Sequence, residues 1–251
     1  MAIVYTDNIE PRKPTQDITL GTTGETITLP GNDLRVNTVK DKGGNTLWTS
    51  NGSGTLSNLN GAFEGNLKLL NTVNASTTSE IVFSNTYINS TYDIYVFKYI
   101  GMHPSNDTVN FQFHGSQNNG AGWNIRKTTC YISMWVAASG NSQDGPLVDN
   151  SYSQGNTTTE QTLGYSIGND NEYGITGELW LFSPSTSTSV THFMSFASYM
   201  KANNEQSTVQ LSGYYGQYSG GDGPGTTIDA IKFVYASGTM DTGTIKLYGI
   251  L

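Results

Sequence analysis

From residue 66 onward, short runs of the chain alternate apolar and polar side chains, and Gly, Asn, Asp or Pro bounds most of these runs. A period of two is typical of half-buried β-strands, and the bounding residues favour turns. Nearly every side chain of residues 92–100 is apolar, which predicts a central strand covered on both faces. We expect strands at residues 67–73, 80–83, 92–101, 108–115, 126–137, 160–166, 174–183, 190–200, 209–215, 227–235 and 242–250.

Helical periodicity is weak in the same part of the chain. A short helix is the alternative to a strand only at residues 191–202. Polar segments at residues 116–123, 139–156 and 216–225 predict surface loops, because Gly, Asn and Ser favour turns. Roughly ten strands in one unit predict an all-β, jelly-roll-like β-sandwich over residues 66–251. The pattern leaves the strand order open.

Residues 1–65 have a different pattern. Pro11 and Pro14 block regular helix and predict an extended arm. Short alternating runs within residues 17–30 and 34–56 surround glycine-bearing turns and predict β-hairpins. Each hairpin carries few apolar residues, and an isolated hairpin is marginally stable in water. We therefore interpret residues 1–65 as an N-terminal arm with a small β segment for attachment or assembly, in contact with a partner chain or a capsid surface.

Composition supports strands over helices. The 251 residues include 29 Gly, and charged residues make up only 13%. Ser, Thr and Asn compete for backbone hydrogen bonds, and each Gly costs about 1 kcal/mol in a helix interior. The 15 Tyr and 9 Phe supply the large apolar side chains that the core of a sandwich needs.

The charge balance excludes one class of partner. The formal net charge is −8, and the 12 Lys and Arg residues form no basic cluster. Nucleic-acid binding requires clustered cations that neutralise phosphates, so we expect no nucleic-acid partner. No run approaches 18 uninterrupted apolar residues, so we also expect no membrane insertion.

A single cysteine, Cys130, excludes an intramolecular disulfide framework. Its neighbours, Thr129 and Tyr131, predict a buried strand position in which the thiol is an inert small hydrophobe. Stability must then come from packing and assembly, which favours a homo-oligomer.

Residues that could support catalysis are scattered. His103, His114 and His192 lack the spacing of a metal site, and no serine lies in a nucleophile elbow. Residues 168–172 resemble a fragment of a calcium loop but lack its remaining ligands, so a tight turn is favoured. We expect that the protein is not an enzyme and that it binds no metal or cofactor. Glycoside cleavage by two carboxylates is the enzymatic alternative, with candidates Glu160, Asp170, Glu172, Glu178 and Asp229.

Two aromatic groups lie near amide-rich or glycine-rich loops. Trp123 is followed by Asn124, and Tyr214, Tyr215 and Tyr218 surround the start of the last glycine-rich loop. A flat ring can cover the apolar face of a sugar while amides bind its hydroxyls. Tyr and Trp also anchor subunit interfaces. We therefore take these five residues as candidate glycan or interface contacts.

Three stretches resemble a family of structural proteins from tailed phages of marine bacteria, including cyanophages. They are the Ile-Thr-Leu repeat of residues 17–29, residues 87–100 with the following Met102-His103-Pro104, and the terminus at residues 243–249. The resemblance implies a β-sandwich, a symmetric assembly and a place on the virion exterior. It supplies no catalytic residues.

Together these features predict a bacteriophage structural protein on the particle exterior, as capsid decoration or a short fibre. The expected partners are further copies of the chain, in a homotrimer, and capsid or tail proteins. Threefold association is expected because short β segments from several chains can bury together what one chain cannot. The alternative is a receptor-binding tail fibre module that recognises host surface glycan.

Overall fold

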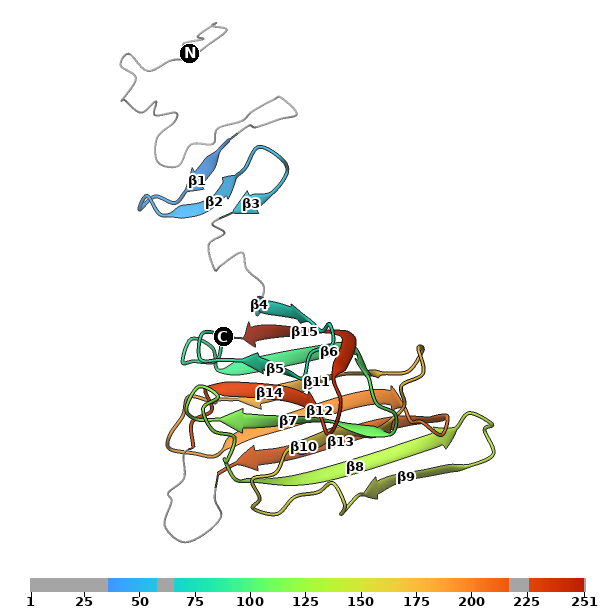
Figure 1. The fold of residues 1–251 in the computed structure, drawn as a ribbon. Coiled ribbons are helices and arrows are strands. Elements are labelled where there is room, and N and C mark those ends of the chain that lie inside the picture. The colour runs from blue at the N-terminus through green and yellow to red at the C-terminus, as the bar shows by residue number, and fades with distance from the viewer. Residues whose placement is uncertain (1–35, 58–65, 217–225, 251) are drawn as a thin grey trace, which may run out of the picture. The chain divides into compact units, whose positions relative to one another are not determined.

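The computed structural model of the protein describes residues 36–57, 66–216 and 226–250. All regular structure in these residues is β-strand (Figure 1). The described residues contain no helix long and apolar enough to cross a membrane. The chain divides into two compact units, Met1–Phe63 and Glu64–Leu251.

The described part of the first unit is a small antiparallel sheet with the order β1-β2-β3. Its strands are β1 (Thr38–Lys40), β2 (Thr46–Ser50) and β3 (Leu56–Ser57). Gly44, with φ +84°, lies in the turn between β1 and β2, and the Asn45 backbone N–H donates to Asp41 Oδ1 at 2.9 Å. The predicted hairpin around this glycine turn is confirmed. The arm and the hairpin predicted at residues 17–30 lie outside the described residues.

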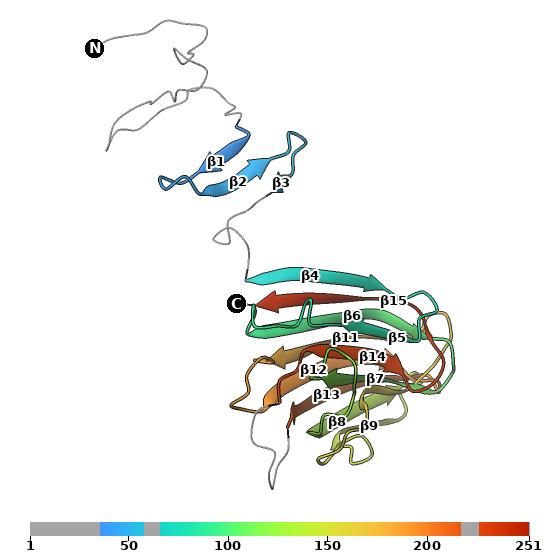
Figure 2. The same cartoon turned by 60° about the vertical axis from the view of Figure 1, so that its left-hand side comes forward.

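The second unit contains two antiparallel sheets, which lie as two layers in Figures 1 and 2. The smaller sheet has the order β10-β7-β14-β5, and the larger has the order β4-β15-β6-β11-β12-β13-β8-β9. The strands are β4 (Leu67–Asn74), β5 (Glu80–Phe83), β6 (Ile94–Pro104), β7 (Val109–Ser116), β8 (Lys127–Ala137), β9 (Gln143–Val148), β10 (Gln161–Ile167), β11 (Ile175–Phe182), β12 (Thr191–Met200), β13 (Glu205–Tyr215), β14 (Ala230–Tyr235) and β15 (Met240–Ile250).

The chain crosses repeatedly between the two sheets. Successive strands β5, β6, β7 and β8 alternate between the smaller and the larger sheet, and β14 returns to pair with β5 and β7. The three consecutive strands β11, β12 and β13 lie between β6 and β8 in the larger sheet. This interleaving of early and late strands is the jelly-roll pattern. The predicted all-β, jelly-roll-like sandwich is confirmed.

Aromatic rings fill the space between the sheets. Phe97 of β6 lies 5.5 Å from Phe233 of β14, and Phe233 stacks on Phe111 of β7 at 5.9 Å. Further along, Phe113 meets Phe193 of β12 edge-to-face at 5.2 Å. All five rings are buried, and aromatic pairs contribute about 0.5–1.5 kcal/mol beyond the area that they bury. The Phe97–Phe233 and Phe113–Phe193 contacts cross between the two sheets and hold them together.

The eleven predicted strands are present, with shifted ends. The helical alternative at residues 191–202 is wrong, because β12 alternates buried and outward side chains and pairs with β11 and β13 along its length. Strand β9 was not predicted and lies within the expected loop at residues 139–156. All six of its residues are exposed, so pairing with β8 holds it rather than burial.

Gly177 of β11 should be required for the packing of the larger sheet. An added Cβ would clash with the backbone oxygen of Phe196 and lie 2.6 Å from the Tyr99 hydroxyl. We expect Gly177→Ala to lower the free energy of unfolding by about 2 kcal/mol in urea titrations, because a strand backbone cannot move away easily. Gly155→Ala, with nothing within 4 Å of its Cβ, is the control and should stay within about 0.5 kcal/mol. Equal stability of both variants would contradict this packing.

Candidate functional site

The larger sheet carries large apolar side chains on both faces, as its central strand β12 shows. Phe193 and Ala197 face the core, whereas Met194 and Phe196 face outward and are 39% and 43% exposed. A sheet with one solvated face normally carries polar side chains there. We call the side of the eight-stranded sheet that is turned away from the smaller sheet the outer face.

Cross-strand pairing brings apolar side chains of neighbouring strands together on the outer face. Trp180 of β11 pairs with Val96 of β6 on one side and with Met194 on the other, and Val96 pairs with Tyr248 of β15. Val96 is fully buried although it lies on the outer face, between Trp180 and Tyr248. Trp180 also stacks with Phe182, with ring centroids 6.4 Å apart. By register, the apolar outer-face residues include Leu67, Leu69, Ile94, Val96, Ile100, Cys130, Ile132, Met134, Val136, Val148, Trp180, Phe182, Met194, Phe196, Tyr214 and Tyr248.

Charged groups of both signs lie in one row of the outer face. Lys246, Lys98 and Glu178 are neighbours across β15, β6 and β11. Lys98 Nζ lies 3.6 Å from Glu178 Oε2, and both side chains are partly exposed. An exposed ion pair of this kind contributes at most about 1 kcal/mol. The row is therefore one polar interruption of the outer face, and the outward Gln206, Thr208, Gln210 and Ser212 of β13 form another.

Two hollows indent the outer face beside β12. The first holds about 470 Å³, and its lining includes Phe182, His192, Met194, Tyr214 and Cys130. The second holds about 420 Å³, and its lining includes Lys98, Ile100, Glu178 and Phe196. Surfaces of this kind bind apolar side chains or flat ligands, because contiguous exposed apolar patches mark interaction sites.

Cys130 lies in this face, and its predicted burial is wrong. The thiol side chain is exposed, and Cys130 pairs with Ser212 of β13. The neighbouring Thr129 and Tyr131 are buried. Since successive side chains of a strand point to opposite faces, the buried neighbours place Cys130 outward.

The five candidate contact residues do not form one site. Trp123 is half-buried with its ring 5.1 Å from Lys232 Nζ of the smaller sheet, and Asn124 beside it is exposed. Tyr214 lies on the outer face, with its ring 6.1 Å from that of His192. Tyr218 lies outside the described residues.

A contact role for Tyr215 is wrong, because this side chain is fully buried. Its ring packs 5.0 Å from that of Phe193 in the core. Tyr214 and Tyr215 are adjacent in β13 and therefore face opposite sides of the sheet.

Sequence reasoning missed the outer-face residues Trp180, Phe182, Met194 and Phe196. The available signal was the run of residues 191–200, in which apolar side chains occupy both parities of an alternating strand. The possible short helix at residues 191–202 covers the same run. Correctly assigned, it indicates a strand with two apolar faces.

Basic side chains from both sheets hold the segment before β10: His114 and Lys232 belong to the smaller sheet, and Lys127 belongs to the larger one. His114 Nε2 lies 2.7 Å from the Thr158 carbonyl oxygen, Lys127 Nζ donates to the Thr159 carbonyl, and Lys232 Nζ donates to Glu160 Oε1 at 3.0 Å. His114 and Lys127 are completely buried. Burial is the main cause that lowers the pKa of Lys127 to about 8. Burial, and then the Lys127 ammonium, lower the pKa of His114 to about 4.

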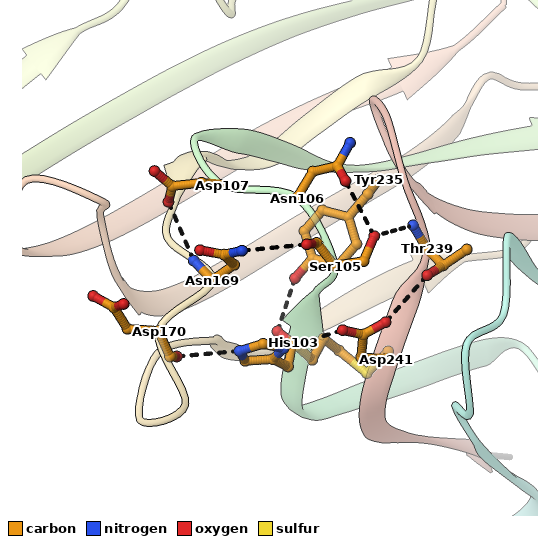
Figure 3. Close-up of polar contacts among 10 residues, drawn as sticks. His103, Ser105, Asn106, Asp107, Asn169, Asp170, Tyr235, Thr239 and Asp241 are labelled. Carbon is orange, nitrogen blue, oxygen red and sulfur yellow. Dashed lines mark hydrogen bonds and ion pairs between the residues drawn. The ribbon is translucent and has the colours of Figure 1, made fainter.

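A second polar cluster joins the loop before β11 to the end of β6 (Figure 3). The Asn169 backbone N–H donates to Asp107 Oδ1 at 3.3 Å, and its side-chain amide donates to the Ser105 carbonyl at 3.2 Å. His103 Nε2 lies 3.1 Å from the Asp170 carbonyl oxygen. The Tyr173 N–H donates to that same carbonyl at 2.8 Å, which closes the turn predicted at residues 168–172.

The candidate carboxylates for glycoside cleavage lie on different parts of the unit. Glu160 is bonded to Lys232 beside the smaller sheet, whereas Glu178 lies on the outer face of the larger one. Asp229 Oδ1 accepts from the Asn119 N–H at 2.8 Å. No group of three or more His, Cys, Asp or Glu side chains in the described part of the chain is placed to hold a metal ion.

No family model, curated protein or solved structure matches the chain. The function is therefore inferred from the residues and the geometry given above.

The buried His114 should make the fold sensitive to acid. Its pKa falls from 6.5 to about 4 in the folded protein, so only the unfolded chain binds this proton between these values. We expect about 3 kcal/mol of stability, fully present above pH 6.5, to be lost as the pH falls through 4. Urea titrations between pH 4 and pH 7 measure it. His114→Gln should weaken this pH dependence, and the same slope in both proteins would contradict the assignment.

Proposed function

We propose that the protein is a structural protein of a bacteriophage particle exterior, in a capsid decoration or a short fibre, and that it works by protein–protein contact in a homo-oligomer. The observation that carries the proposal is the outer face. A side chain such as Phe196 is 43% exposed near the middle of an eight-stranded sheet. Since large contiguous apolar patches mark contact sites, a covering partner is expected.

The composition supports the same role. Only 35% of the residues are hydrophobic, and yet many of them lie on the outer face. A chain with so few apolar residues would ordinarily place them in its core. Covering this face would remove apolar area from water, which favours association. Association through the outer face would therefore add to the stability of the particle.

The described part of the first unit supports an attachment role. None of residues 36–57 is fully buried, and its sheet has three short strands. A three-stranded sheet needs a hydrophobic face for independent stability, and the described residues of this one bury none of their side chains fully. Contact with another virion protein, such as a capsid or tail protein, would supply the missing burial. The resemblance of three stretches to structural proteins of marine phages points to the same setting.

A receptor-binding tail fibre module is the second candidate. The hollow beside Tyr214 favours it, because Phe182 and His192 place further rings there and Thr128 and Ser212 add hydroxyl groups. Aromatic rings cover the apolar faces of sugars, and hydroxyl groups bind their polar edges. In this alternative the ligand would be a host surface glycan.

Localisation on the particle tests the proposal. Gold-labelled antibody against the second unit should bind intact purified phage, and the protein should remain with the particles through density-gradient purification. Labelling of the capsid surface supports decoration, and labelling of the tail supports a fibre. A glycan array on the purified protein tests the receptor-binding alternative. Absence of the protein from purified particles would contradict the proposal.

A further inference from the structure

We infer that the outer face of the eight-stranded sheet is the surface through which two copies of this chain pack against each other. This inference rests on the proposed function, because it names the partner in the protein–protein contact. Area, charge and shape of the outer face each support a second copy as the occupant.

The area matches a stable interface. Eight strands spaced about 4.8 Å apart span about 38 Å, and the length from His192 to Met200 is about 27 Å. The outer face therefore covers on the order of 1,000 Å². A standard protein–protein interface buries about 800 Å² on each partner. One copy can cover the face of another without help from other surfaces.

The charges permit contact between like copies. The whole chain carries −8, so two copies repel each other over most approaches. The central row of the outer face instead carries Lys98, Lys246 and Glu178. Since both signs are present in the same row, a rotated copy can place its carboxylate opposite a lysine. The outer face is thus a surface on which the overall repulsion is locally absent.

The projecting side chains and hollows of the outer face are suited to contact with the same face of a second copy. Met194 and Phe196 are neighbouring outward side chains of β12, and each borders one of the two hollows. In an isologous contact the same patch supplies both the projecting groups and their receiving sites. A second copy turned about an axis near β12 can place its Phe196 in a hollow of the first. Gln210 and Ser212 on β13 provide hydrogen-bonding groups at the same level.

Cys130 reports directly on the contact. Its side chain is exposed in the single chain, and it borders the hollow next to Met194. A copy seated on the outer face would cover this thiol. Reaction with a thiol reagent should therefore slow as the oligomer forms and recover on dilution. Because the sequence contains one cysteine, the signal comes from this position alone.

Sedimentation equilibrium of the full chain, with Phe196→Glu as the variant, tests the inference. We expect the wild-type protein to be an oligomer at micromolar concentration and the variant to have a dissociation constant at least about 10-fold higher, because a charge replaces a central apolar contact. Val82→Glu is the matched control: Val82 is 39% exposed on the smaller sheet, so its substitution should leave association unchanged. Circular dichroism of each variant reports whether it folds.

The outcomes separate this inference from the proposed function. Protection of Cys130 in the wild-type oligomer supports the inference without any substitution, so it decides the matter if Phe196→Glu fails to fold. A wild-type monomer, an oligomer that Phe196→Glu leaves intact, or a Cys130 that reacts equally at all concentrations overturns it. Presence of the protein on purified particles would then still support the proposed function, with a different partner on the outer face.

Discussion

A β-strand turns successive side chains to opposite faces of its sheet, and in strand β12 both faces receive apolar groups. Phe193 faces inward and packs on Phe113, which joins the larger sheet to the smaller one. Phe196 faces outward from the same strand and remains 43% exposed. The inward ring joins the two sheets, and the outward ring contributes to the surface that the proposed assembly would cover. The fold and the proposed assembly thus depend on one local pattern.

The two sheets differ in what covers the sides that face away from the core. On the smaller sheet, Lys232 binds Glu160 and lies over the ring of Trp123, so chain segments from the same unit cover part of that side. The described residues place no comparable segment over Met194 and Phe196. The outward side of a sheet can be covered by loops of the same chain or by another molecule. The larger sheet is suited to cover by another molecule. Because His114 and Lys127 are buried where they hold the segment before β10, the packing of that segment is sensitive to pH.

Much of the fold could be predicted because the strands carry strong local signals. The alternation in β7, and Gly174 and Pro184 on either side of β11, identify strands without tertiary information. Strand β9 could not be found in this way, because its Gly145-Pro146 and its exposed side chains give no strand pattern, and only pairing with β8 forms it.

The candidate site was harder to predict. Trp180 and Met194 are neighbours only because β11 and β12 pair in one register, and single-strand patterns do not reveal which face is already covered.

The proposed assembly depends on what covers the outer face in the assembled protein. A cryo-electron microscopy structure of the protein in purified particles tests it most directly, because it shows the surroundings of Met194 and Phe196. We expect both side chains to be buried against the outer face of a second copy. Outer faces that are exposed to solvent in the mature particle would contradict it.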